Sequence, residues 1–351
     1  MSESKTRLRD IARLAKVSPA TVSRVANGNP QVDPKIQAAV LVAAKKLDID
    51  LTITRRNRTI AFVLGNRDRV NEFQSRILMG AENYCAQHNW DLLFISFRND
   101  LSAPPSNVQL PEALIKPNRV SGAILSGTHS ASVLASLRER RIPFSTTGNN
   151  IVGDWRPEEF DCVTTDDVRG AAEATQYLIS QGHRNIWFIG NQRVPWFERC
   201  GRGYRQVMEE AGLEPHFSEL QADDRELGYL AVKSLLTNRS RPTAIFGGND
   251  DIASGVYQAL QESGVLIPDD ISVAGFNDTL GELLHPGLTT AREFPREVGG
   301  HLAEFVLRRI QDPALPPQQL MIPTVLVKRE SVRKIESSEA AFRHPDHAIV
   351  S

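Results

Sequence analysis

The chain has 351 residues, 41% of them hydrophobic and 24% charged, which is enough for two or three globular domains with a substantial core. Its net charge of −1 is unevenly distributed, because residues 1–58 hold twelve Lys and Arg against five acids, a balance of +7, and leave −8 for the remainder. No apolar run reaches the length of a membrane span, the polar N-terminus does not resemble a signal peptide, and the three cysteines are too widely spaced for a disulfide framework or a zinc site. These features predict a cytoplasmic protein whose basic head binds a polyanion.

The first predicted helix lies just before a tight turn at Lys16-Val-Ser. Ile11, Leu14 and Ala15 recur at i, i+3 and i+4, the spacing of one helix face. Ser18 is a preferred N-cap and Pro19 fits the first helical position, where its missing N–H leaves no hydrogen bond unmade. A second helix is therefore expected to begin at this pair.

The second helix has two different faces. Val22 and Val25 are predicted to point inward, and Gly28 ends the helix. The outward strip is small and basic and consists of Ala20, Thr21, Arg24 and Asn27. Two short helices with this turn and this outer strip predict a helix-turn-helix that reads DNA.

A third helix is predicted to complete the head. Asp33 can cap it and Pro34 can occupy its first turn. Its inward face is predicted to hold Ile36, Val40 and Leu47, while several alanines keep the helix slim.

Beyond residue 58 the pattern changes to short strands that alternate with helices. The β-rich runs are 60–64, 92–97, 120–125, 142–145, 186–189, 243–246 and 271–276. The helical stretches are 73–87, 132–140, 168–181, 199–211, 226–236 and 252–263. This alternation predicts parallel sheets covered by helices on both faces, and its duplication predicts two stacked α/β lobes. Ligands of such sheets bind at the carboxyl ends of the strands, which places the expected site in the cleft between the lobes.

Several segments, in order along the chain, resemble the LacI/GalR family of bacterial transcription regulators. Residues 8–47 are similar to its DNA-binding head, whose signature runs close to V-S-x-x-T-V-S-R-V-x-N-G. Further similar segments are 71–74, 178–190, 242–250, 271–278, 288–290 and 326–332. Together they cover about residues 6–335. The resemblance implies a homodimer that binds a pseudo-palindromic operator in double-stranded DNA and closes on a small molecule.

The implied fold is an all-α helix-turn-helix head followed by an α/β core of two doubly wound parallel-sheet lobes, similar to type I periplasmic binding proteins. The expected division is a head at 1–47, a basic linker at 48–58, an effector-binding and dimerisation core at 59–336 and a mobile tail at 337–351. Within the core, lobe 1 is expected at about 59–162 and 292–322, and lobe 2 at about 163–291 and 323–336.

The resemblance also implies DNA contacts for the second helix. The base-reading positions match Pro19, Ala20 and Arg24, of which Arg24 can bond guanine O6 and N7 in a bidentate way, a phosphate contact being its alternative role. Positions expected at phosphates are Thr21, Ser23 and Asn27, and Ser18 at the helix start belongs to the same surface.

The linker departs from the family pattern. It is shortened, and the usual hinge helix with its leucine wedge has no counterpart in it. Arg55, Arg56 and Arg58 are instead expected along phosphates or in a narrow minor groove.

The effector cleft is implied by family positions and by aromatic side chains. Asn249 and Asn277 match ligand-facing positions, and Asn277 in place of a carboxylate favours a neutral polyol. Asn149 lies beside a position where a ligand-binding Asp is common, and Arg199 would replace a pocket arginine whose usual position holds Cys200. The candidates for stacking on a sugar ring, with core packing as the alternative, are Phe73, Trp196 and Phe197.

The sequence therefore predicts a sequence-specific DNA-binding regulator, a repressor by expectation, controlled by a sugar or sugar derivative. A purine-like or phosphorylated metabolite is the alternative effector, and a sugar-binding protein without a DNA role is a further alternative. No Walker A, GxSxG or HExxH motif and no GxGxxG after a strand occurs, so we expect no enzyme activity, no cofactor and no metal.

Overall fold

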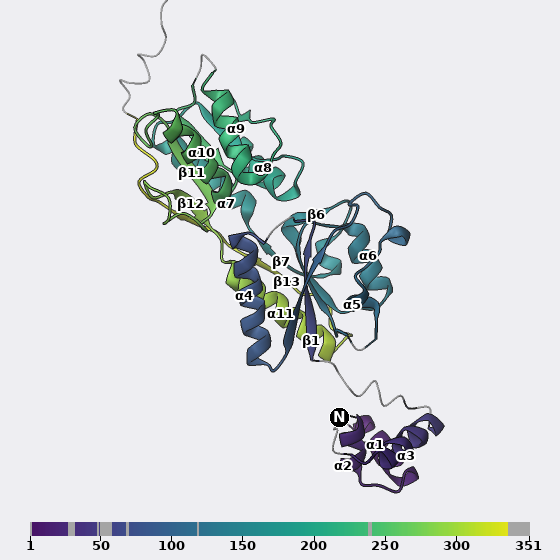
Figure 1. Cartoon of the computed structure of the whole chain (residues 1–351). Coiled ribbons are helices and arrows are strands. Elements are labelled where there is room, and N and C mark those ends of the chain that lie inside the picture. Colours follow the sequence, from purple (N-terminus) through teal and green to yellow (C-terminus); the bar gives the residue numbers. More distant parts are fainter. Residues whose placement is uncertain are drawn as a thin grey trace, which may run out of the picture.

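The computed structural model describes residues 2–26, 32–47, 49, 58–67, 70–117, 119–237 and 241–335. Figure 1 shows a small all-helical head and two α/β lobes. The predicted fold class is confirmed. The expected tail at 337–351 lies outside the described residues. None of the helices in the described part is long and apolar enough to cross a membrane.

The head consists of α1 (Ser2–Leu14), α2 (Pro19–Ala26) and α3 (Pro34–Lys46). The Asp33 carboxylate caps α3 by accepting a hydrogen bond from the backbone N–H of Lys35 at 2.7 Å. The buried side chains that the three helices share are Ile11, Ala12, Val22, Val25, Val40, Ala43 and Ala44. The inward predictions for Val22, Val25 and Val40 are therefore confirmed.

The inward predictions for Ile36 and Leu47 are wrong, and Leu14, which shares a predicted helix face with Ile11, is exposed as well. Leu14, Ile36 and Leu47 are 46%, 38% and 39% exposed, respectively. Ala12, Ala43 and Ala44 take part of the contact face instead, beside Ile11 and the three valines. The helical period thus identified the helices but not the edges of their narrow contact face.

Lobe 1 is built on a six-stranded sheet in which every pairing is parallel. In spatial order its strands are β13 (Gln319–Ile322), β7 (Asp161–Thr165), β5 (Phe144–Thr147), β3 (Ala123–Gly127), β1 (Thr59–Gly65) and β2 (Asp91–Phe97). Helices α4 (Glu72–Gln87) and α11 (Pro295–Gln311) cover one face, and α5 (Glu112–Ile115) and α6 (Ala131–Glu139) cover the other (Figure 1). A two-stranded sheet of β4 (His129–Ser130) and β6 (Ile151–Val152) completes the lobe.

Lobe 2 repeats this plan with one difference. In spatial order its strands are β14 (Val325–Val327), β12 (Thr289–Arg292), β11 (Ser272–Asn277), β10 (Ala244–Gly247), β8 (Ile186–Ile189) and β9 (His216–Phe217). The edge strand β14 is antiparallel to β12, so the prediction of purely parallel sheets holds for all pairings of lobe 2 except this one.

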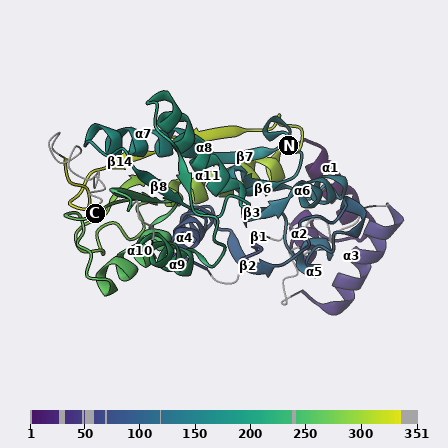
Figure 2. The same cartoon turned by 90° about the horizontal axis from the view of Figure 1, so that it is seen from above.

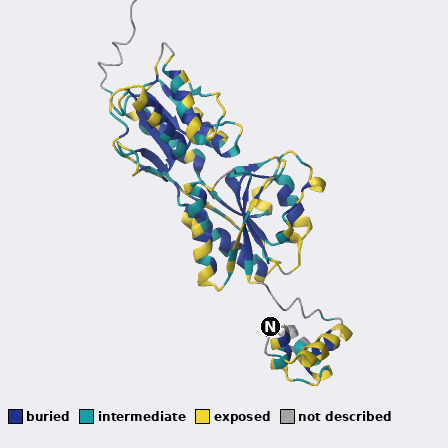
Figure 3. Ribbon diagram, viewed as in Figure 1, coloured by how far each residue is buried: buried dark blue, intermediate teal, exposed yellow. Residues whose placement is uncertain are grey.

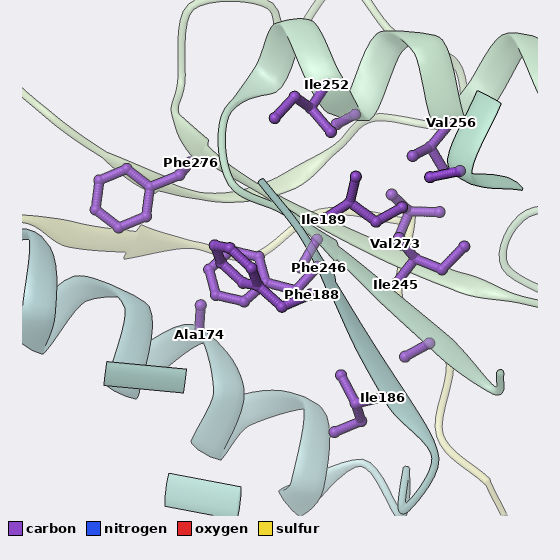
Figure 4. Close-up of a cluster of buried hydrophobic side chains, with 14 of the residues drawn as sticks. Ala174, Ile186, Phe188, Ile189, Ile245, Phe246, Ile252, Val256, Val273 and Phe276 are labelled. Carbon is purple, nitrogen blue, oxygen red and sulfur yellow. The ribbon is translucent and has the colours of Figure 1, made fainter. Parts of the chain in front are cut away.

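Helices sandwich the second sheet. Figure 2 shows α7 (Asp167–Ser180) and α8 (Pro195–Glu210) on one side of β8, and α9 (Asp224–Leu235) and α10 (Asp250–Glu262) on the other. The side chains packed on both faces are mostly apolar. Figure 3 shows the sheet strands in dark blue, the colour of buried residues. In Figure 4, Phe188 and Phe246 lie on the α7 side, and the rings meet edge to face at 5.3 Å.

The chain passes between the lobes three times, after β7, after β12 and after β13. Because β7 and β12 carry polar residues such as Asp161 and Thr289, their sequences lack the apolar run that marked the other strands. The helix α11 was missed as well, since two adjacent glycines interrupt its pattern. These elements, absent from the prediction, border the cleft.

Candidate functional site

The outer face of α2 is a candidate DNA-reading surface. Ser18 Oγ accepts a hydrogen bond from the backbone N–H of Thr21 at 3.1 Å and lies 2.8 Å from Thr21 Oγ1, which fixes the helix start. Since Val22 and Val25 are buried, the opposite face turns to solvent. That face holds the exposed Ser18, Pro19, Ala20 and Arg24 and the partly buried Thr21 and Ser23. The structure thus brings six of the predicted contact residues together.

Arg24 is the basic residue in the last turn of α2, and it is exposed. Small neighbours on the same face allow the helix to approach a groove closely. Arg58 is exposed immediately before β1, whereas Asn27, Arg55 and Arg56 lie outside the described residues. The predicted roles of these four side chains stay predictions.

A small cavity lies at the carboxyl ends of β5 and β7. Its volume is about 30 Å³, room for one or two water molecules. The side chains that line it are Phe73, Gln74, Ile77, Thr147, Asn149, Asn150, Val163, Thr165, Trp196, Glu293 and Val298. Three of the seven predicted effector residues, Phe73, Asn149 and Trp196, are among them. The cavity lies at the carboxyl ends of parallel strands, where ligands of such sheets commonly bind.

Contacts across the cleft hold the lobes together. The backbone N–H of Trp196 in lobe 2 donates to Asn150 Oδ1 in lobe 1 at 3.2 Å. Arg76 of α4 donates to the backbone carbonyls of Asp278 and Thr279 at 3.4 and 3.3 Å. The Trp196 ring is held edge-on by Phe276 at 5.3 Å and so presents a fixed aromatic wall. The lobes are therefore closed on each other around the cavity.

The Asn149 side chain forms hydrogen bonds to Thr165 in lobe 1 and to Asp167 in lobe 2. Its Nδ2 donates to the Thr165 carbonyl at 2.9 Å and to Asp167 Oδ2 at 2.8 Å, while its Oδ1 accepts from the Thr165 N–H at 3.0 Å. These bonds use both amide protons, which leaves the second lone pair of Oδ1 for a ligand.

Arg199 pairs with the same Asp167 carboxylate and is not among the residues that line the cavity. Its Nε is 2.9 Å from both carboxylate oxygens of Asp167, and its Nη2 is 2.8 Å from Oδ1. Burial raises the pKa of Asp167, and the hydrogen bonds and positive charge of Arg199 oppose that shift. The Arg199 guanidinium group therefore forms an ion pair with a buried carboxylate and does not face the cavity.

Three predicted effector residues lie away from the cavity. Phe197 is buried in the core of lobe 2, so the alternative of core packing fits its position. Asn249 caps α10 by accepting from the Ile252 N–H at 2.8 Å, and it donates to Asp224 at 2.7 Å. Asn277 accepts from the hydroxyl of Thr279 at 2.9 Å, at a left-handed φ of 86°.

Sequence reasoning missed several polar residues of the cavity: Gln74, Thr147, Asn150, Thr165 and Glu293. Thr147 and Asn150 follow a predicted strand, so the rule that ligands meet strand ends could have found them. Glu293 follows β12, which was not predicted. Among the described residues, no group of three or more His, Cys, Asp or Glu side chains could hold a metal ion.

Two family models match the chain. Residues 7–49 match the bacterial regulatory proteins of the lacI family, and residues 175–332 match the periplasmic binding protein-like domain. The first match covers the head and the second covers most of lobe 2.

Curated relatives extend the similarity to nearly the whole chain. The ribose operon repressor of Haemophilus influenzae is 31% identical over 341 residues, which cover 94% of this chain and 99% of that repressor. Among solved structures, the complex of the transcriptional regulator CelR with cellobiose has a TM-score of 0.68 at 27% identity, covering 92% of this chain and 99% of that one. A LacI family regulator from Enterococcus faecium with bound ribose has a TM-score of 0.67 at 25% identity, covering 79% of this chain and 100% of that one.

The relatives are repressors and regulators, and their similarity spans the head and both lobes. The chain is accordingly a DNA-binding regulator under small-molecule control and not an enzyme. It belongs to the lacI family of bacterial transcription regulators.

Proposed function

We propose that the protein is a cytoplasmic, homodimeric repressor whose affinity for a pseudo-palindromic operator is set by a sugar bound between its two lobes. The head is assigned to residues 1–47, the linker to 48–58 and the effector core to 59–336. The observation that carries the proposal is the interlobe cavity, which combines aromatic walls with neutral hydrogen-bonding groups.

The cavity chemistry favours a sugar. Phe73 and Trp196 supply rings for the apolar face of a sugar, and Thr147 and Asn150 supply polar groups for its hydroxyls. Among the lining residues there is no Lys or Arg, so a phosphorylated metabolite would lack a counter-charge. The H. influenzae relative is named for the ribose operon, and related structures contain ribose and cellobiose. A purine-like base, which also stacks on aromatic rings, is the second candidate.

The size of the cavity argues for a movement. Ligand pockets are typically about 300–1,000 Å³, whereas this cavity holds about 30 Å³. A sugar therefore enters only if the lobes separate, which breaks contacts such as that of Trp196 with Asn150. We expect the three interlobe segments to carry this movement toward the heads.

A homodimer is supported by apolar side chains exposed on neighbouring elements of lobe 1. Met79 on α4 and Leu93 and Phe94 on β2 are each more than one-third exposed. Apolar surface of this kind is typical of an interface. Two copies joined there would present two heads, as a two-fold operator requires.

The test uses the full-length protein and the DNA upstream of its own gene, with a scrambled fragment of equal composition as the control. We expect selective retardation of the upstream fragment and a change of at least tenfold in affinity with D-ribose or cellobiose. A response to adenine alone would establish the second candidate. Equal retardation of both fragments, or no response to any of these compounds, would contradict the proposal.

A further inference from the structure

Glu293 is a buried acid at the edge of the cleft. It lies between β12 and α11, in one of the three segments that join the lobes, and it lines the cavity. Only 4% of the residue is exposed. A carboxyl group in such a place needs a structural or a binding reason, because its burial without partners is unfavourable.

Only one half of the Glu293 carboxyl group has a partner. Its Oε1 accepts a hydrogen bond from Thr165 Oγ1 at 2.6 Å. Its Oε2 is buried and has no hydrogen-bond partner within the described part of the chain. The Asn149 amide is bonded to Thr165 and Asp167, and the Thr165 hydroxyl is bonded to Oε1, so neither side chain supplies a partner for Oε2. The unpartnered oxygen belongs to a side chain that lines the cavity, so a polar group of a ligand that widens the cavity can become its partner.

Burial, assisted by two nearby acids, favours the neutral form of Glu293. Burial is the largest cause of a pKa of about 8, and the negative charges of Asp167 and Asp250 raise it further against the hydrogen bond from Thr165. Arg199 is paired with Asp167, and Asp250 accepts from Thr290 Oγ1 at 2.8 Å and from the Leu280 N–H at 3.0 Å.

Cys200 of α8 is a further titratable neighbour. Burial raises the pKa of its thiol, which therefore stays protonated. At neutral pH the Glu293 carboxyl group is therefore an acid with one O–H donor, and Oε1 is free to keep its bond from Thr165.

We propose that Glu293 binds the effector directly, its Oε2 hydroxyl donating a hydrogen bond to an oxygen of a neutral polyhydroxy ligand. This inference rests on the proposed function of the cleft as a sugar site. It deepens that function by naming the charge class of the ligand, because a protonated acid offers no counter-charge to an ammonium group and the cavity lining holds no Lys or Arg to pair with a phosphate or carboxylate. It also makes effector affinity depend on pH.

The experiment is isothermal titration calorimetry of the full-length protein with D-ribose and cellobiose at pH 7 and pH 9. The variants are Glu293→Gln, which keeps a donor in the same place, and Glu293→Leu, which has none. The control is Glu297→Gln, an exposed acid in the first turn of α11. Circular dichroism at each pH establishes that every variant is folded.

We expect wild type and the Glu297 variant to lose up to about tenfold in affinity from pH 7 to pH 9, as Glu293 ionises. The Glu293→Gln variant is expected to bind within about threefold of wild type at pH 7 and to show no such pH dependence. Removal of the donor in Glu293→Leu is expected to weaken binding by about tenfold or more.

Three outcomes overturn the inference. Sugar affinity unchanged in Glu293→Leu, or equal pH dependence in wild type and Glu293→Gln, contradicts the contact while leaving the sugar site intact. Tighter binding of D-glucosamine than of neutral sugars, lost in Glu293→Gln, shows an ionised carboxylate paired with an ammonium group. Binding of no sugar to any protein contradicts the proposed function itself, and the inference with it. If Glu293→Leu does not fold, the pH profile of Glu293→Gln decides alone.

Discussion

Arg199 and Asp167 form an ion pair in which two nitrogens of the guanidinium meet one buried carboxylate, with Nη2 2.8 Å from Oδ1. The Asp167 side chain is fully buried and also accepts a hydrogen bond from Asn149 in the other lobe at 2.8 Å. One carboxylate therefore joins a helix of lobe 2 to the strand-end loop of lobe 1 that borders the cavity.

Loss of Arg199 is expected to destabilise the core strongly. Arg199→Leu leaves the Asp167 charge buried without a counter-ion, which typically lowers the free energy of unfolding by about 3–5 kcal/mol. The double variant Arg199→Leu with Asp167→Asn removes the charge and is expected to recover at least half of that loss. Urea unfolding followed by tryptophan fluorescence measures both. A single variant as stable as wild type would show that the pair contributes nothing.

Two adjacent glycines in α11 are expected to respond in opposite ways to the same substitution. A Cβ on Gly299 would overlap the Ile77 carbonyl of α4, whereas the nearest atom to a Cβ on Gly300 is the Gly80 carbonyl oxygen at 3.9 Å. Gly299→Ala must push the helices apart and is expected to lower stability by about 1–3 kcal/mol. Gly300→Ala only gains helix propensity and is expected to raise stability by up to about 1 kcal/mol. Thermal unfolding compares them, and equal midpoints would contradict the close approach of α4 and α11.

The parts of this fold that depend on neighbours in sequence were predictable. The caps at Ser18 and Asp33 are local hydrogen bonds, and the apolar runs at β1 and β8 mark buried strands by themselves. The cleft is different, because Thr165 and Glu293 are 128 residues apart and meet only when both lobes have formed. No local pattern identifies such a pair.

Non-local contacts also explain why two candidate effector residues, Asn249 and Asn277, do not line the cavity. Asn249 and Asn277 do stand at the ends of lobe 2 strands or at the helix that follows, as predicted. The Asn249 amide bonds Asp224 and Ile252, and the Asn277 Oδ1 accepts from Thr279, contacts that depend on loop conformation. A family position thus predicts the neighbourhood of a side chain better than its partners.

Arg24 is expected to control discrimination between DNA sequences more than overall affinity. If its guanidinium reads a base, Arg24→Ala lowers the ratio of operator to random-DNA affinity by about 5- to 150-fold, which corresponds to 1–3 kcal/mol. The control is Arg13→Ala on α1, whose side chain is 84% exposed and pairs with Asp10 at 3.4 Å. Fluorescence anisotropy at one fixed salt concentration measures both ratios. An equal loss on operator and random DNA in Arg24→Ala would assign the residue to a phosphate.

Glu293 is expected to make the core less stable as the pH rises. Its pKa is about 8 in the folded protein against an ordinary value of 4.5, mainly because of burial, so between these values the unfolded chain gives up a proton that the folded chain keeps. The contribution to stability is then complete below about pH 4.5 and is lost by about pH 8, at up to about 1.4 kcal/mol per pH unit. Burial lowers the pKa of His183 to about 4, which weakens the fold in the acid direction, so the total profile mixes opposite effects. The difference in free energy of unfolding between wild type and Glu293→Gln cancels these shared effects. We expect this difference to shift in favour of the variant as the pH rises from 5 to 8. The free energy of unfolding of Glu297→Gln is expected to follow the same pH dependence as that of wild type. A pH-independent difference would mean that Glu293 is ionised in the folded protein, and would remove its hydrogen-bond donor from the cleft.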